Sequence, residues 1–487
     1  MRKFKLLTGL FLTLILVACS KDNDDVDVTT NDINAFVYRG MNSFYLYKDD
    51  VSDLANDRFK SDSDFNNFLN GFDSPSNLFN HLVFNQQDRF SWIVDDYIAL
   101  EQSFSGVSTS HGMEVQFFRL NNTIYGIVTH VLPNTSAQTN GVKRGDVFYA
   151  INNTPFTANN IRALLAPDNY QINIGTYNTN NTPETFDDTI TETNKRIELT
   201  KAQFTENPIL VNKVLDNNGK KIAYLMYTGF TGTNQFNTNL INVFTDFKNA
   251  NATELVLDLR YNPGGSVRTA IILGSLITGQ FKDEVFSTEQ WNAEFQEFFN
   301  NQDPELLINR FIDSHNGQTL PGLNLSRLYV LTSPRSASAS ELIINSLRPY
   351  INVVQIGTNT SGKFQASTTI YDSDNFRRQG ANPNHTYAMQ PLIFKSLNVA
   401  GVTDYFNGLS PDILLEESLE NLGVLGDVNE PLLARALADI KGNTAKQAPQ
   451  KTDRIPMFSI HNTQSINEGM YDNKTKHLNL LKKLKLE

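Results

Sequence analysis

Hydrophobic positions divide the 487-residue chain into stretches with different periodicities. Between residues 32 and 104, apolar side chains recur at helical spacing, as at Phe36, Met41 and Phe44, and Asp-, Ser- and Asn-rich breaks interrupt them. Because residues at this spacing share one face of a helix, the pattern predicts a small helical domain over 32–104. We expect the aromatic side chains to form its core.

Residues 105–200 follow a second pattern, in which short apolar stretches alternate with turn residues. A strand pattern at 127–131 precedes a short helical stretch, the sequence Gly-Val-Lys-Arg-Gly-Asp at 141–146, and a further strand that ends in Ile-Asn-Asn at 151–153. The order predicts a β-rich domain.

From 201 to 435 strand and helix patterns alternate, which favours an α/β domain. The predicted strands are 222–226, 255–259, 328–331 and 353–356, and the predicted helices are 237–247, 267–276 and one that follows Ser338. A strand also fits 365–371, which is rich in β-branched residues. The last stretch, 436–487, is polar and less patterned, and we expect a loosely packed tail there.

The N-terminus has the pattern of a secretion signal. A basic start at 1–5 precedes an apolar run at 6–17 that is too short to span a membrane comfortably. The run ends in Leu-Val-Ala-Cys, which resembles a bacterial lipobox, so that 1–18 would be removed and Cys19 would carry the lipid. The acidic stretch within 19–31 fits a solvated tether and also resembles the surface-export signal of Bacteroidetes lipoproteins. The expected location is the cell envelope, at the outer membrane and with the cell surface favoured.

Composition excludes several classes of function. The net charge of −11 and the absence of a basic block before the last few residues argue against nucleic-acid binding. The seven histidines are scattered without metal-ligand spacing, so we expect neither a metal nor another cofactor. Cys19 is the only cysteine, which leaves no disulfide within the chain.

Three turns that follow predicted strands carry the candidate chemistry. The first is Asn-Pro-Gly-Gly at 262–265. Backbone N–H groups of Gly264 and Gly265 at a helix start would suit a developing oxyanion. The alternative is a tight turn that needs glycine at positive φ.

The second turn contains three serines, Ser336, Ser338 and Ser340, before a helix. Small neighbours let a carbonyl substrate approach a serine closely, although serine is also a preferred helix cap. The third turn, 357–364, is close to a phosphate-binding loop, but Phe364 replaces the required hydroxyl and a strand follows where a helix is needed. Lys363 within it is either a base for the serine or an exposed loop lysine.

Together the three motifs resemble the carboxyl-terminal-processing (tail-specific) peptidases, a serine peptidase family with a Ser-Lys dyad. The family pairs an Asp-Leu-Arg-x-Asn-x-Gly-Gly turn, here 258–265, with a Ser-Ala-Ser-Glu helix start, here 338–341, and a later Gly-Lys, here 362–363. The resemblance implies an α/β core of the crotonase/Clp type. The family spacing, 363 − 338 = 25, makes Ser338 the nucleophile and Lys363 the base. The oxyanion would be held by Ala339 and by Gly264 or Gly265.

The stretch 105–200 resembles a PDZ domain, which binds extended peptides along a sheet edge. The resemblance implies a peptide-binding loop at Gly112, Met113, Glu114 and Val115. Family members often place a glutamine four residues after the lysine. Here Ser367 occupies that position and the glutamine is Gln365, so either could orient Lys363.

These expectations amount to a lipid-anchored serine endopeptidase that acts on proteins or peptides. The second hypothesis is a catalytically silent protein of the same fold that binds peptides or another ligand. The third is a crotonase-type enzyme, whose acyl-coenzyme A substrate a secreted location disfavours. The sequence carries no prediction of oligomeric state.

Overall fold

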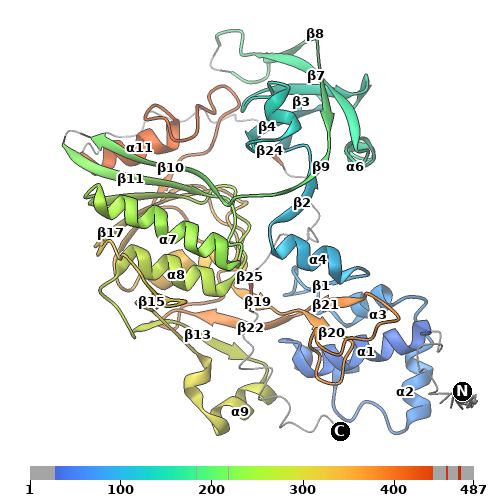
Figure 1. Cartoon of the computed structure of the whole chain (residues 1–487). Helices are drawn as coiled ribbons and strands as arrows, with labels where there is room; N and C mark the ends of the chain where they lie inside the picture. The colour runs from blue at the N-terminus through green and yellow to red at the C-terminus, as the bar shows by residue number, and fades with distance from the viewer. Residues whose placement is uncertain (1–27, 183, 218, 443–456, 459–469, 473–487) are drawn as a thin grey trace, which may run out of the picture.

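The computed structural model describes residues 28–182, 184–217, 219–442, 457–458 and 470–472 (Figure 1). The predicted signal peptide, Cys19 and most of the tether lie outside these residues. No helix within the described ranges is long and apolar enough to cross a membrane.

The N-terminal region is helical, as the sequence predicts. Helix α1 (Thr30–Phe44) begins at a capping box, in which Thr29 Oγ1 accepts the Asp32 N–H and the Asp32 carboxylate accepts the Thr29 N–H. Phe36, Met41 and Phe44 are buried on one face of α1, as their spacing requires. The other elements are η2 (Lys48–Asp50), η3 (Ser52–Leu54), α2 (Asp62–Leu69), α3 (Pro75–Leu82), β1 (Trp92–Val94) and α4 (Tyr97–Phe104).

The next region is a β-rich domain with its own core. Its sheet has the order β24-β3-β4-β5-β7-β8, in which β24 comes from the C-terminal stretch of the chain. The elements are β2 (Val107–Ser110), β3 (Met113–Leu120), β4 (Thr123–Val131), α5 (Ser136–Thr139), β5 (Val147–Ile151), β6 (Thr154–Pro155), α6 (Ile161–Leu165), β7 (Asn169–Asn178) and β8 (Thr189–Thr200). A ribbon of β2 and β9 (Ala202–Thr205) leads from this domain to the α/β domain (Figure 1).

A six-stranded sheet forms the centre of the α/β domain. Alternate residues point to opposite faces: Ala223 and Leu225 meet helices on one side, whereas Ile222 and Tyr224 face α11 on the other. The strands, in spatial order, are β10 (Ile209–Asn217), β11 (Lys220–Tyr227), β12 (Glu254–Asp258), β17 (Arg327–Thr332), β18 (Asn352–Gly357) and β23 (Ile413–Leu414), parallel from β11 onward. The helices are α7 (Asn234–Asn249), α8 (Val267–Thr278), α10 (Ala339–Leu347) and α11 (Pro431–Ile440).

A five-stranded sheet of order β14-β13-β22-β19-β25 lies beside this domain. The predicted strand over 365–371 is wrong as one element, because it divides into β19 and β20, which join different sheets. The Thr368 hydroxyl, at the break, donates to Asp472 O (3.0 Å). The elements are β13 (Val285–Trp291), α9 (Ala293–Gln302), η4 (Pro304–Leu307), β14 (Ile308–Arg310), β15 (Ser314–His315), β16 (Gln318–Thr319), β19 (Gln365–Ser367), β20 (Ile370–Tyr371), β21 (Ala388–Gln390) and β22 (Leu392–Leu397).

The expectation of a loose tail from residue 436 is wrong for the part of it that is described. Helix α11 crosses the expected domain boundary at 435, and its buried Leu437 and Ile440 pack on the six-stranded sheet. Further along, β24 (Met457–Phe458) and β25 (Met470–Tyr471) each add a strand to a sheet edge. Main-chain hydrogen bonds hold strands of two residues in place. Because such bonds do not depend on side chains, the sequence of these strands shows no periodic pattern.

Candidate active site

Ser338 lies in the turn between β17 and α10, at the N-cap position of the helix. Its backbone has φ +65° and ψ −111°, and the residue is fully buried. A residue other than glycine in this conformation costs about 1–3 kcal/mol and persists where the surrounding structure enforces it, as it often does at functional sites. The turn therefore holds Ser338 in a conformation that an ordinary helix cap does not need.

Hydrogen bonding distinguishes the three serines of this turn. The Ser336 hydroxyl donates to Leu259 O (2.8 Å) and the Ser340 hydroxyl to Asn262 O (3.0 Å), so both tie the helix start to the neighbouring turn. The Ser338 hydroxyl has no hydrogen-bond partner among the described residues. It therefore does not cap the helix with its side chain, and it is the hydroxyl that remains available for chemistry.

The glycine turn after β12 lies directly against Ser338. Gly264 has φ +112°, as the expected tight turn requires, and a Cβ built on it would lie 2.7 Å from Ser338 Cβ. The Gly264 N–H donates to Asn262 Oδ1 (2.9 Å). The N–H groups of Gly265 and Ala339 make no hydrogen bond within the described part of the chain.

Glu341 joins Ser338 to Lys363. Its Oε2 accepts both the Ser338 N–H (2.7 Å) and the Lys363 N–H (2.8 Å). Its Oε1 accepts the Gly362 N–H (2.7 Å) and the Thr360 hydroxyl (2.6 Å). Burial raises the pKa of Glu341 to about 7, although the four donors act in the opposite direction. One carboxylate thus fixes the backbone of both candidate catalytic residues.

Lys363 is buried, with 2% of its surface exposed, so the alternative of an exposed loop lysine is wrong. Its Nζ lies 4.9 Å from the centroid of the Phe90 ring, which the N-terminal helical region supplies. The N-terminal helical region thus covers the side chain of Lys363 and shields it from water.

The two residues expected to orient Lys363 make hydrogen bonds elsewhere. Gln365 Nε2 donates to the Tyr47 hydroxyl (2.8 Å), and the Ser367 hydroxyl donates to Gln390 Oε1 (2.7 Å). Both residues line the same strand, β19, directly after the lysine.

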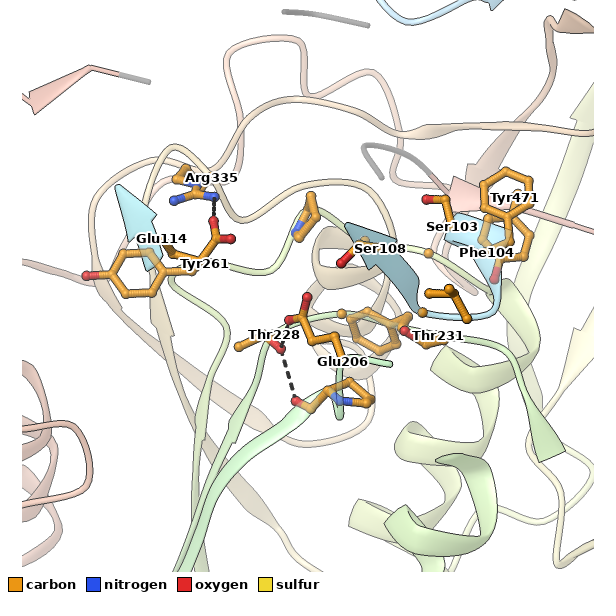
Figure 2. A pocket seen from close by; sticks show the side chains of 18 of the residues that line it. Ser103, Phe104, Ser108, Glu114, Glu206, Thr228, Thr231, Tyr261, Arg335 and Tyr471 are labelled. Atoms are coloured by element: carbon orange, nitrogen blue, oxygen red, sulfur yellow. Dashed lines mark hydrogen bonds and ion pairs between the residues drawn. The ribbon is translucent and has the colours of Figure 1, made fainter. Parts of the chain in front are cut away.

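A cavity of about 240 Å³ adjoins the glycine turn, between the β-rich and α/β domains (Figure 2). Glu114 of β3 and Arg335, three residues before Ser338, form an ion pair at one side of it, with 3.8 Å between the carboxylate and Nη2. Burial raises the pKa of Glu114, and the Arg335 charge opposes that shift. Glu114, a member of the expected peptide-binding loop, thus pairs with a cation.

The expected peptide-binding loop is partly engaged in local hydrogen bonds. The Gly112 N–H donates to Ser110 Oγ (2.9 Å) and the Met113 N–H to His111 Nδ1 (3.0 Å). The Met113 side chain is buried in the domain core, and that of Val115 packs against it. Two of the N–H groups that would receive a peptide carboxylate are therefore already paired.

Sequence reasoning missed three contributors to this site. Glu341 stood within a quoted motif without a role, although Ser-x-x-Glu before a helix is a recognisable capping signal. Phe90 and Tyr47 reach the site from the N-terminal region, and no local pattern marks them. Among the described ranges no group of His, Cys, Asp and Glu side chains could hold a metal ion.

Comparisons with known proteins relate two segments of the chain to one family. The family model "Peptidase family S41" matches residues 221–390, and "Peptidase S41 N-terminal domain" matches 32–92. A carboxyl-terminal-processing protease from Picosynechococcus sp. is 26% identical over 173 residues, which span 36% of each chain. The chain thus matches about a third of the length of this curated relative.

A solved structure of an S41 protease from Bacteroides fragilis shares the fold, with a TM-score of 0.65, 23% identity and coverage of 84% of this chain and 98% of its own. The expected mixed α/β fold with an N-terminal helical region is confirmed, and the match to the family extends to the helical region. The chain therefore carries two domains of peptidase family S41, the peptidase domain over 221–390 and the N-terminal domain over 32–92.

Proposed function

We propose that the chain is a serine endopeptidase with Ser338 as nucleophile and Lys363 as general base. The observation that carries the proposal is the shared oxygen of Glu341, which accepts the backbone N–H of both residues at 2.7 and 2.8 Å. A serine hydroxyl needs an adjacent base to become a nucleophile. The unpartnered Ser338 hydroxyl supports the role of nucleophile, and the buried Lys363 side chain supports that of the base.

In the proposed reaction, Ser338 Oγ attacks the carbonyl carbon of the scissile peptide bond while its proton passes to a neutral Lys363 Nζ. The tetrahedral intermediate then releases the amine, which takes that proton, and an acyl-enzyme remains. Water, deprotonated by Lys363, hydrolyses the ester and restores Ser338. The first step needs an unprotonated amine, and burial of Lys363, with 2% of its surface exposed, is the condition under which a lysine can supply one.

The proposed oxyanion donors are the N–H groups of Ala339 and Gly265. Both are without a hydrogen bond in the described chain, whereas the Gly264 N–H is already held by Asn262. Gly264 contributes instead by the absence of a side chain, since a Cβ there would collide with Ser338. Losing one donor of this type typically costs about 10²–10³ in rate.

Turnover of an unfolded protein or a peptide by purified variants tests this proposal. We expect Ser338→Ala and Lys363→Ala each to lower kcat by at least about 10³-fold, as removal of a nucleophile or its base does elsewhere. Ser346→Ala is the matched control, because Ser346 is a buried serine of the same helix whose hydroxyl has no partner among the described residues. Equal activity in all variants would exclude the dyad, and no turnover by any of them would favour the catalytically silent binding protein.

The proposed substrates are proteins or peptides, and the proposed location is the cell envelope, through a lipid on Cys19. The lipobox-like sequence before Cys19 supports the anchor. We expect wild-type chain from cells to carry a labelled fatty acid and to sediment with membranes, and Cys19→Ala to do neither. A soluble, unlabelled wild type would refute the anchor and leave the peptidase proposal untouched.

A further inference from the structure

A short piece of the chain's own C-terminal stretch, Met470–Asp472, lies along the candidate active site. Strand β25 runs parallel to β19, the strand that follows Lys363. The Tyr471 N–H donates to Gly265 O (3.1 Å), and the Asp472 N–H donates to Ser367 O (3.0 Å). The neighbouring Gly264 packs on Ser338, so this piece pairs with the same glycine turn that the proposed nucleophile contacts.

Most contacts of this piece involve its main chain. Ser367 Oγ donates to Met470 O (3.3 Å), and Thr368 Oγ1 donates to Asp472 O (3.0 Å). The four bonds thus engage the N–H groups of Tyr471 and Asp472 and the carbonyl groups of Met470 and Asp472. Any extended peptide presents the same groups, so this edge can accept other sequences in the same way.

Two side chains give the contact its chemical preference. Met470 is fully buried. The Tyr471 ring stacks on Phe104 with 4.3 Å between ring centroids, and its hydroxyl accepts the Gly232 N–H (3.3 Å). The edge of β19 that this piece occupies therefore favours an aliphatic residue followed by an aromatic one.

Tyr471 and Phe104 also separate two hollows of the surface. Both side chains line the cavity of about 240 Å³ beside Glu114 and Arg335, at whose side Figure 2 shows them together. Both also line a larger groove of about 1090 Å³ on their other side. The stacked pair is thus part of the lining of both hollows.

A second piece of the same stretch occupies another sheet edge. Met457 and Phe458 pair antiparallel with Phe118 and Phe117 of β3, the strand that carries Glu114. The rings of Phe458 and Phe117 lie 6.4 Å apart. The C-terminal stretch thus fills a strand position in both the β-rich domain and the five-stranded sheet.

We propose that the β19 edge with the Gly265 carbonyl is a binding site for extended peptides that carry an aliphatic–aromatic pair, and that the chain's own residues 470–472 occupy it as a tethered competitor. The inference rests on the proposed peptidase function and adds a preference and a form of self-inhibition to it. A tethered segment acts at an effective concentration up to about the millimolar range. A free peptide displaces it only if its affinity for the site outweighs that concentration.

Binding of a labelled peptide tests the site without any catalysis. The probe has the sequence of residues 466–474, and fluorescence anisotropy measures its affinity for the full chain with Ser338→Ala. We expect Tyr471→Ala in that background to tighten binding at least tenfold, because it weakens the internal competitor. A peptide with alanine at the positions of Met470 and Tyr471 should bind at least tenfold more weakly than the probe, and Phe186→Ala, at an exposed phenylalanine, should change nothing.

Turnover supplies the second readout. With Ser338 intact, Tyr471→Ala should lower KM several-fold with little change in kcat, and the probe peptide should inhibit competitively. Asp472→Pro removes the N–H that donates to Ser367 O, together with the carboxylate, and keeps Tyr471. It should act in the same direction if Tyr471→Ala folds poorly.

Unchanged peptide affinity and unchanged KM in both tail variants would overturn the inference, since the tail would then be a structural strand only. That result, with turnover still dependent on Ser338, would leave the proposed function standing. Tighter peptide binding by the tail variants without any turnover would instead refute the peptidase and retain the peptide site.

Discussion

Two buried carboxylates, Glu341 and Glu417, each accept several hydrogen bonds, but their donors differ. Glu341 faces three backbone N–H groups and one hydroxyl, all neutral, and burial raises its pKa to about 7. Glu417 faces the guanidinium groups of Arg144 and Arg260 and the hydroxyl of Tyr261, and these groups lower its pKa to about 2 against the effect of burial. Charged donors keep a buried carboxylate ionised, whereas neutral donors leave it near the point of titration.

The difference matches what each carboxylate connects. Glu417 links Arg144 of the β-rich domain (2.6 Å) to Arg260 beneath the glycine turn (3.0 Å), and so joins two domains through fixed charges. Glu341 links the proposed nucleophile to the loop of the proposed base. The first connection is structural and insensitive to pH near neutrality, and the second can respond to pH in the working range.

The largest expected effect comes from breaking the charged cluster. Arg260 is fully buried and pairs with Asp258 (2.9 Å) and Glu430 (2.7 Å) as well as Glu417. Arg260→Leu would leave these carboxylates without their cation, so we expect a loss of about 3–5 kcal/mol in the free energy of unfolding. Chemical denaturation followed by circular dichroism measures it.

Arg327→Leu is the matched control, because Arg327 pairs with Glu254 but its side chain is 31% exposed. Its loss should cost no more than about 1 kcal/mol. Similar costs for the two variants would contradict the view that the Arg260 cluster depends on burial.

The second effect concerns the neutral cluster. Glu341→Gln keeps the shape of the side chain but replaces one carboxylate oxygen with an NH2 group. That group donates and does not accept, so the two donors that face it lose their acceptor. The cost of about 1–3 kcal/mol for such groups corresponds to roughly a 5- to 150-fold lower kcat if it falls on the geometry of the proposed dyad. Steady-state kinetics on a peptide substrate measures it.

Glu289→Gln serves as its control. Glu289 is also buried and also accepts from neutral donors, Trp291 Nε1 (3.1 Å) and Asn309 Nδ2 (3.1 Å), but it lies on β13 away from the glycine turn. We expect the kcat of Glu289→Gln to equal that of the wild type. Equal loss of kcat in both variants would show a general effect of buried carboxylates and not a role of Glu341.

The sequence predicts the sheet of the α/β domain well, because apolar runs such as 222–226 and 255–259 are bounded by turn residues and alternate with helix patterns. It also brings Ser338, Lys363 and the glycine turn into one hypothesis, since each follows a strand of the same parallel sheet. Phe90 reaches Lys363 from more than 270 residues away in the chain, and no local pattern encodes such a contact. The two-residue strand β25 escaped prediction because main-chain hydrogen bonds hold it.

The third effect is on pH dependence. With a pKa of about 7, Glu341 loses its charge as the pH falls, so kcat/KM should decrease below about pH 7, and Glu341→Gln should remove that limb. Stability follows the opposite signs of the two shifts. The raised pKa of Glu341 contributes stability below its ordinary value of 4.5 that is lost as pH rises through 7, and the lowered pKa of Glu417 contributes stability above 4.5 that is lost as pH falls toward 2. The free energy of unfolding, measured against pH for Glu341→Gln and Glu417→Gln, checks these signs. If the two variants change that pH dependence in the same way, the assignment is contradicted.

The smallest effect would sharpen the same comparison. Thr360 Oγ1 donates to Glu341 Oε1 (2.6 Å) and accepts the Leu409 N–H (2.7 Å), so Thr360→Val removes one of the four neutral donors. Because that donor lowers the pKa of Glu341, its loss should move the acid limb of kcat/KM to higher pH, while kcat above the limb changes little. Thr358→Val is the control, since the Thr358 hydroxyl is buried without a partner in the described chain. An unshifted limb in Thr360→Val would assign the titration to a group other than Glu341.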